Sequence, residues 1–246
     1  MALYSPKYNY VAHFIPKCAC TFVRCMFLYM HHDEYDMEMK EIFDKVKNNK
    51  EITNTHSLII DIHNKSREGK SLPIKKCPRF VVVRNPYSRA VSMYTDKYIG
   101  NSPSDKWGKE YLPKDLTFNQ FLDTIKILQD QLESRPNSHF HIQMKRSPLN
   151  KKVTSKIKIE DGNQPILDWY KYNVPNLDQS LINDAIDFGN MFHNPSHYGD
   201  QEGDATNINF YKKPITHTKE SFLTTETKQK IFDIYKKDFT ILGYEP

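Results

Sequence analysis

Residues 79–83, with the sequence RFVVV, limit the choice of fold more than any other stretch of the chain. A continuous run of apolar, β-branched residues is typical of a strand that is buried on both faces of a parallel sheet. The next residues, RNPYSRAVSMY, predict a helix, because Asn85 is a good N-cap and Pro86 suits the first helical position. A buried strand that passes directly into a helix predicts an α/β fold.

A second strand-to-helix turn is predicted near the N-terminus. Residues 8–15, YNYVAHFI, are rich in strand formers, and Pro16 ends the run. From Thr21 onward, apolar side chains recur at helical spacing. The remaining expectations are helices over 118–128 and 224–244, strands over 55–62 and 156–160, an otherwise irregular stretch over 133–166, and a long surface loop over 190–211.

The length and charge of the chain narrow its class. With 246 residues, we expect one α/β domain spanning 1–246, with a central parallel sheet flanked by helices. The net charge of +5 suits an anionic ligand, but Lys and Arg are interspersed with Asp and Glu, so we expect no nucleic-acid partner. No apolar run approaches the about 18 residues that span a bilayer, and the N-terminus lacks the pattern of a signal peptide. We therefore expect no membrane partner and a cytoplasmic protein.

The cysteines are unevenly placed, since three of the four lie within residues 18–25. Cys18 and Cys20 flank a single residue, which is too close for a relaxed disulfide, and no second pair has zinc-ribbon spacing. We interpret them as reduced thiols and expect no metal. The alternative is a metal site built from Cys18, Cys20 and either His31 or His32.

The turn PKCACT, residues 16–21, has the features of an anion site. A turn between a parallel strand and a helix presents main-chain N–H groups at the positive end of the helix dipole. Lys17 adds a cation that can reach phosphate or sulfate oxygens, and Thr21 adds a hydroxyl donor. The intervening small residues let an anion approach the main chain, which is the role we give to the two cysteines here.

A second candidate anion site follows the buried strand. Arg84 directly follows that strand, at the end where open α/β sheets bind ligands. Ser88 and Ser92 are four residues apart and therefore share one face of the predicted helix. Two anion sites after successive strands predict a ligand with two separated phosphates.

Together, PKCACT and VVVRNPYSRAVSMYTDKY resemble the paired signatures of sulfotransferases that use 3′-phosphoadenosine 5′-phosphosulfate (PAPS). The closest similarity is to the carbohydrate branch, in which helices beginning RxPxxRxVSxY are typical; SHFHIQ and IYKKDFTILGY resemble two further segments of that branch. The resemblance implies a P-loop-like PAPS-binding fold, release of the product PAP, and no metal. It assigns the 5′-phosphosulfate to Lys17, Cys18, Ala19, Cys20, Thr21 and Phe22, and the 3′-phosphate to Arg84 and Ser92.

The resemblance also implies transfer of a sulfuryl group to an acceptor hydroxyl, with Lys17 stabilising the leaving group. We expect a carbohydrate acceptor; a phenol, a small alcohol or a peptide tyrosine is the alternative. A hydroxyl needs a general base, and His56 is our first choice, with Glu34 or Glu38 next. His139 and His141 are expected to line the acceptor side, and His139 is a further candidate for the base.

Two other functions compete with this one. A nucleotide or small-molecule kinase would share the strand–turn–helix logic, but it would need GxxxxGK[ST], and in this chain Lys17 precedes the small residues instead of following them. A catalytically inactive PAPS-binding protein would keep both phosphate motifs and show binding without turnover.

Overall fold

The computed structural model describes residues 2–35, 77–99, 112–133, 142–143, 154–191, 198–211 and 213–246. Its sheet has the strand order β1-β2-β3-β4. The four strands are β1 (Ala2–Ser5), β2 (Tyr10–His13), β3 (Arg79–Val83) and β4 (Thr154–Lys158). β1 is antiparallel to β2, whereas β2, β3 and β4 are parallel, with Val11 opposite Arg79 and Val83 opposite Lys158. The predicted α/β class with a central, mostly parallel sheet is confirmed.

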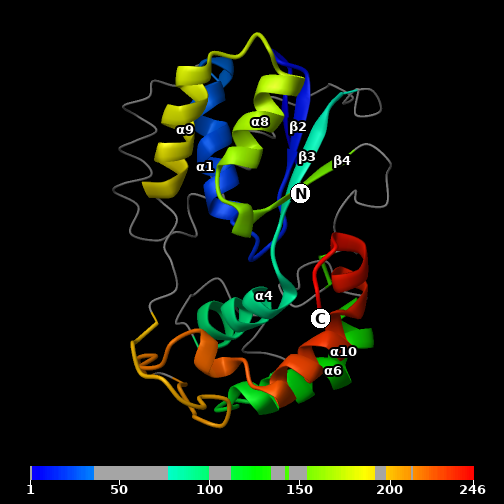
Figure 1. Cartoon of the computed structure of the whole chain (residues 1–246), viewed down its shortest axis with the longest axis vertical. Coiled ribbons are helices and arrows are strands. Elements are labelled where there is room, and N and C mark those ends of the chain that lie inside the picture. Colours follow the sequence, from blue (N-terminus) through cyan, green and yellow to red (C-terminus); the bar gives the residue numbers. More distant parts are fainter. Residues whose placement is uncertain are drawn as a thin grey trace. The chain divides into compact units, whose positions relative to one another are not determined.

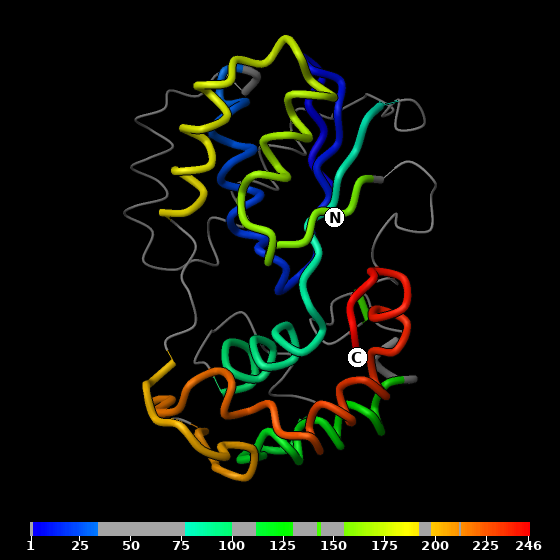
Figure 2. The backbone as a smooth tube through the Cα atoms, viewed as in Figure 1, coloured from blue at the N-terminus to red at the C-terminus, as the bar shows by residue number. Residues whose placement is uncertain are grey.

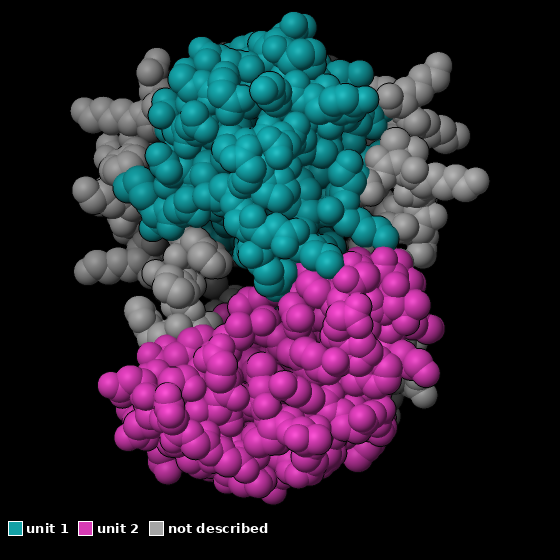
Figure 3. Space-filling view, in the orientation of Figure 1, with its two compact units in different colours: residues 1–83, 147–194 teal, residues 84–146, 195–246 magenta. Residues whose placement is uncertain are grey.

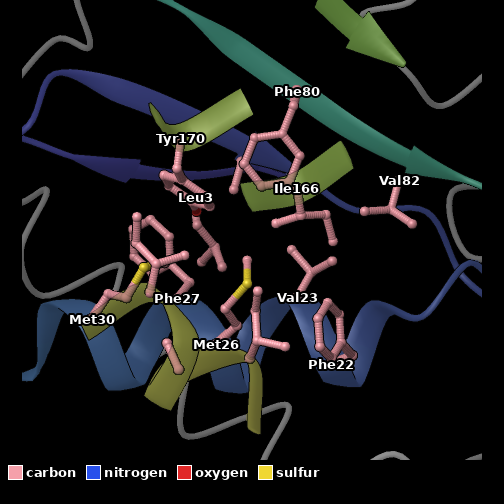
Figure 4. Close-up of a cluster of buried hydrophobic side chains, with 14 of the residues drawn as sticks. Leu3, Phe22, Val23, Met26, Phe27, Met30, Phe80, Val82, Ile166 and Tyr170 are labelled. Carbon is pink, nitrogen blue, oxygen red and sulfur yellow. The ribbon is translucent and has the colours of Figure 1, made fainter. Parts of the chain in front are cut away.

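Three helices pack on the sheet and bury one apolar core with it (Figure 1). They are α1 (Cys20–His31), α8 (Gln164–Asn173) and α9 (Gln179–Met191). Figure 4 shows Phe80 and Val82 of β3 pointing toward Met26 and Val23 of α1, with Ile166 of α8 alongside. Because side chains alternate along a strand, Val81 and Val83 point to the opposite face, and they are buried as well. β3 is therefore buried on both faces, as its sequence predicts.

The other helices pack around a second core that is rich in aromatic rings. They are α4 (Pro86–Met93), a π-helical continuation (Tyr94–Ile99), α6 (Phe118–Glu133) and α10 (Thr225–Leu242). Tyr94 contacts Phe118, Phe121 and Phe222. α6 and α10 lie side by side, and Lys230 joins them through its ion pair with Asp123. Short 3₁₀ turns cover His32–Tyr35, Ile159–Asp161 and Glu220–Phe222.

The chain forms two compact units, each assembled from two separate stretches (Figure 3). Unit 1 comprises residues 1–83 and 147–194, and unit 2 comprises residues 84–146 and 195–246. The sheet and its three helices belong to unit 1, in which α1 and α9 run alongside each other (blue and yellow in Figure 2). The helices α4, α6 and α10 belong to unit 2. A single domain over 1–246 remains a prediction.

Most predicted elements are present, but three were missed. The predicted stretches contain β2, α1, β3, α4, α6, β4 and α10. The loop predicted over 190–211 is wrong at its start, because α9 extends to Met191, whereas residues 198–211 contain no helix or strand. β1, α8 and α9 were not predicted, and the stretch 133–166 is not irregular throughout, since β4 and the start of α8 lie within it. The predicted strand over 55–62 lies outside the described residues. No helix of the described part of the chain is long and apolar enough to cross a bilayer.

Candidate functional site

The turn between β2 and α1 has an unusual main-chain conformation. Lys17 and Ala19 both have positive φ angles, of 67° and 52°. For residues with a Cβ atom this left-handed conformation costs roughly 1–2 kcal/mol each. The Cys18 N–H donates to the Ile15 carbonyl oxygen at 3.0 Å and closes the turn. Turns that contain left-handed residues can orient successive N–H groups into a concave anion-binding surface.

The start of α1 leaves main-chain donors available. Ala19 is the N-cap residue, and no side chain caps the helix. The first main-chain bond of the helix runs from the Val23 N–H to the Ala19 carbonyl oxygen, at 3.0 Å. The N–H groups of Cys20, Thr21 and Phe22 therefore have no acceptor within the helix, and they lie at the positive end of its dipole. Lys17, Cys20 and Thr21 are each partly exposed, as an anion site requires.

Phe22 is fixed by its own packing. Its ring is buried against α9 at Gly189, where an added Cβ atom would lie 2.7 Å from a ring carbon. Gly189 therefore lets α9 approach α1 closely enough to cover this ring. Phe22 was predicted to bind the cofactor; since its ring is buried and apolar, only its main-chain N–H is suited to contact an anion. The role of Gly189 could not be predicted, because a single glycine within a helix has no specific structural meaning.

The cysteines of residues 18–25 are mostly buried and contribute to the packing of the interior. All four cysteines lie in the described ranges and are present as thiols, with Cys20 alone partly exposed. Burial raises the pKa of Cys25 to about 12, so its thiol stays protonated at neutral pH. The alternative metal site fits poorly: His31 Nε2 lies 2.6 Å from the Tyr10 hydroxyl, and His32 Nδ1 lies 2.9 Å from the Tyr29 carbonyl oxygen.

The turn between β3 and α4 is closed by side chains. Asn85 is the N-cap of α4, as predicted, and its Oδ1 accepts the Tyr87 N–H at 2.9 Å. Pro86 occupies the first helical position and has no N–H to satisfy. Ala90 and Val91 of this helix are fully buried. Arg84, which directly precedes the cap, is partly exposed.

The main chain of Arg84 is held by Gln143. The Arg84 N–H donates to Gln143 Oε1 at 3.1 Å, and Gln143 Nε2 donates to the Arg84 carbonyl oxygen at 2.7 Å. The Gln143 N–H in turn donates to Asp238 Oδ2 of α10 at 2.8 Å. Gln143 and Asp238 lie within SHFHIQ and IYKKDFTILGY, but no role was predicted for either residue. Their link to Arg84 spans three distant parts of the chain, and no local pattern reveals it.

Ser92 lies on the last turn of α4 and is almost completely buried. Its hydroxyl donates to Asp96 Oδ2 at 2.9 Å, one turn further along the chain. Arg84 and Ser92 both belong to unit 2, whereas Lys17 and the start of α1 belong to unit 1. The remaining predicted site residues, His56, His139 and His141, lie outside the described residues, as does Glu38. Glu34 lies in the 3₁₀ turn after α1.

Comparison with known proteins identifies the class of this chain. No curated protein and no solved structure gives a significant match. A family model described as "Sulfotransferase family" matches residues 1–245, which include both candidate anion-binding turns. That match supports sulfuryl transfer in general, and it favours this reaction over the phosphoryl transfer of the kinase alternative. The chain belongs to the sulfotransferase family.

Proposed function

We propose that the protein is a PAPS-dependent sulfotransferase that acts on a hydroxyl of a carbohydrate. The observation that supports it most is the start of α1, where left-handed Lys17 and Ala19 precede a helix without a side-chain cap. Such a start binds an anion through main-chain N–H groups. In a sulfotransferase, the anion suited to this position is the 5′-phosphosulfate of the donor.

Lys17 is proposed to act on the leaving group. In the transfer step, the acceptor oxygen forms a bond to sulfur while the bond between sulfur and the bridging phosphate oxygen breaks. PAP leaves with the electron pair of that bond, and the acceptor proton passes to a base. The ammonium group of Lys17 would neutralise the charge that grows on the bridging oxygen. The N–H groups of Cys20 to Phe22 and the Thr21 hydroxyl would hold the 5′-phosphate in line for this displacement.

Arg84 and Ser92 are proposed to bind the 3′-phosphate. A guanidinium group can donate two parallel hydrogen bonds to phosphate oxygens, which gives Arg84 the larger share of this role. The Ser92 hydroxyl donates to Asp96, so it would have to rotate away from that carboxylate to donate to a phosphate. We therefore expect Ser92 to contribute less than Arg84.

His56 is proposed as the general base, with Glu34, Glu38 and His139 as alternatives. An imidazole with an ordinary pKa near 6.5 is suited to accept a proton at neutral pH. The carbohydrate acceptor rests on the similarity of RNPYSRAVSMY to the corresponding helix of the carbohydrate branch. His139 and His141 would line the acceptor side.

Calorimetric titration with PAP tests the donor, with ATP and ADP as controls. We expect PAP to bind and the two controls to bind at least about tenfold more weakly, because they lack a 3′-phosphate. Absence of PAP binding by the folded protein would refute the proposal.

A transfer assay with labelled PAPS tests the reaction and its acceptor. Candidate acceptors are a panel of saccharides, a simple phenol and a tyrosine peptide. Sulfation of a saccharide is the expected result, and exclusive sulfation of the phenol or the peptide would overturn the acceptor class. Tight PAP binding without transfer to any member of the panel would identify an inactive PAPS-binding protein.

A further inference from the structure

Gln143 pairs with Arg84 as one peptide group pairs with another across a sheet. The side-chain amide offers one donor and one acceptor, and Arg84 uses its N–H and its carbonyl oxygen to meet both, at 3.1 and 2.7 Å. In an antiparallel sheet, two opposed residues exchange both hydrogen bonds in the same way and are held extended. The amide thus holds the main chain of Arg84 extended directly before the N-cap of α4.

Gln143 is itself fixed by a buried charge. Its main-chain N–H donates to the carboxylate of Asp238 at 2.8 Å, and both residues have no exposed surface. A hydrogen bond to a carboxylate is stronger than one between neutral groups, and more so away from water. Because both polar ends of the Gln143 side chain are bonded to Arg84 and the residue is fully buried, Gln143 is poorly placed to contact a ligand itself.

Asp238 lies among further buried polar groups of unit 2. The pKa of Tyr235 is raised, mainly because the phenol is buried. Arg89 opposes this rise and Asp238 adds to it, so both side chains lie close enough to act electrostatically on the phenol. The Arg89 guanidinium carbon lies 5.9 Å from the centre of the Tyr235 ring. The side chains of Arg89 and Asp238 therefore both lie in this buried interior.

We propose that Gln143 and Asp238 are positioning residues that orient Arg84 for binding the 3′-phosphate. The inference rests on the proposed function, since it assigns to two buried residues the placement of the arginine that we expect to hold that phosphate. They act through the main chain of Arg84 and do not touch the ligand. Their loss should therefore remove the benefit of the 3′-phosphate and leave recognition of the 5′ end unchanged.

The test compares binding of PAP with binding of adenosine 5′-monophosphate (AMP), which lacks the 3′-phosphate. In Gln143→Met, which keeps the length of the side chain but removes both bonds to Arg84, we expect the Kd for PAP to rise about tenfold. The Kd for AMP should change less than about twofold. A merely structural role would weaken both ligands or neither.

Gln129→Met is the matched control. Gln129 lies on α6 in the same unit, and its Nε2 donates to the Ile234 carbonyl oxygen at 3.1 Å, so the same substitution removes a comparable bond far from Arg84 in the sequence. We expect both ligands to bind it as they bind the wild type. A second control is Gln143→Met in an Arg84→Ala background, where it should have no further effect on PAP binding, because the arginine that it positions is gone.

Asp238→Asn keeps the proposal testable if Gln143→Met does not fold. Asparagine retains an oxygen that can accept the Gln143 N–H but removes the charge, so we expect the Kd for PAP to rise about threefold with AMP unaffected. An unchanged ratio of the two Kd values in whichever of the two variants folds, judged by circular dichroism, would overturn the inference. If the wild type does not bind PAP at all, the proposed function is refuted. If the wild type binds PAP but the variants keep the wild-type ratio of the two Kd values, only the positioning role is refuted.

Discussion

The N-termini of α1 and α4 differ in how their first main-chain N–H groups are capped. α1 begins with left-handed Ala19 and no capping side chain, so its first N–H groups are available to a ligand. α4 begins with Asn85, whose side chain already accepts the Tyr87 N–H, and with Pro86, which has no N–H. Both helices follow strands of the same parallel sheet, yet only the second has a side-chain cap at its N-terminus.

The difference shows where each turn must obtain its affinity for phosphate. Under the proposed function, affinity at α1 would come from the main chain, and the side chain of Lys17 would be left for chemistry. At α4, the Tyr87 N–H is already bonded to Asn85, so affinity for the 3′-phosphate would have to come from the proposed ligands Arg84 and Ser92. Substitutions should therefore separate catalysis, phosphate binding and folding at the two turns.

The largest effect is expected from Lys17→Ala. If Lys17 stabilises the leaving oxygen, removal of its charge should abolish measurable transfer, that is, lower the rate by at least about 10²–10³-fold. Initial rates with labelled PAPS measure it. Lys7→Ala is the control, because Lys7 is about half exposed and forms an ion pair with Asp33. Near-wild-type turnover in Lys17→Ala would contradict the proposed role.

His56→Ala separates chemistry from binding at both turns. If His56 is the base, the rate should fall ~10²–10⁴-fold, while PAP binds as in the wild type. Single-turnover rates and calorimetry measure the two quantities on the same preparation. A loss smaller than about tenfold would favour Glu34, Glu38 or His139, and each can then be substituted in turn.

Arg84→Ala tests the dependence of the second turn on a side chain. Loss of a charge-assisted hydrogen bond should weaken PAP binding by ~1.5–3 kcal/mol. AMP binding should stay unchanged, because AMP lacks the 3′-phosphate that Arg84 is proposed to bind. Calorimetric titration with both ligands measures this effect. Equal weakening of PAP and AMP would show that Arg84 does not act on the 3′-phosphate.

Asn85→Ala should affect folding and not binding. Loss of the N-cap leaves the Tyr87 N–H without its acceptor and should lower the free energy of unfolding by about 1 kcal/mol. Urea denaturation measures the change, and Asn85→Ser, which keeps a capping oxygen, is the control. A stability equal to that of the wild type would mean that the cap is not limiting, and a selective loss of AMP affinity would give Asn85 a role in ligand binding.

Ala19→Gly should give the smallest effect and the opposite sign. Glycine adopts a φ of 52° without the penalty of a Cβ atom, but it also loses more backbone entropy on folding. We expect the free energy of unfolding to rise by about 0–1 kcal/mol. Ala90→Gly, in the buried face of α4, is the control and should lower it by about 1 kcal/mol or more. A similar loss in both variants would contradict a strained Ala19.

The parts of the fold that the sequence predicts are those with strong local signals. RFVVV is apolar throughout, and Asn85 and Pro86 mark the first turn of α4, so β3 and α4 are found at the expected residues. β1 is too short for its alternation to be recognised. α8 and α9 were missed because their apolar side chains match the shape of α1 and of the sheet, and that shape is set only by the tertiary fold.

The features of the candidate site also fall into those with a local sequence signal and those that depend on the tertiary fold. Lys17, Thr21 and Arg84 could be predicted as site residues because each lies within a short motif whose residues are consecutive in the chain, and their roles stay predictions. The left-handed angles of Lys17 and Ala19 could not be predicted, since neither residue favours that conformation. The bonds from Gln143 to Arg84 and from Gln143 to Asp238 join residues that only the folded chain brings together.

The composition of each unit from two stretches of chain has a consequence for synthesis on the ribosome. β3 pairs with β4, and Val83 lies opposite Lys158, so the first residue is made long before its partner. At about 5–20 residues per second, the delay is about 4–15 s. During this interval the growing chain exposes one edge of its most apolar strand while much of unit 2 emerges, and an exposed strand edge can pair with another chain. Nascent chains of this protein are therefore expected to depend on a chaperone that shields β3 until β4 has been translated.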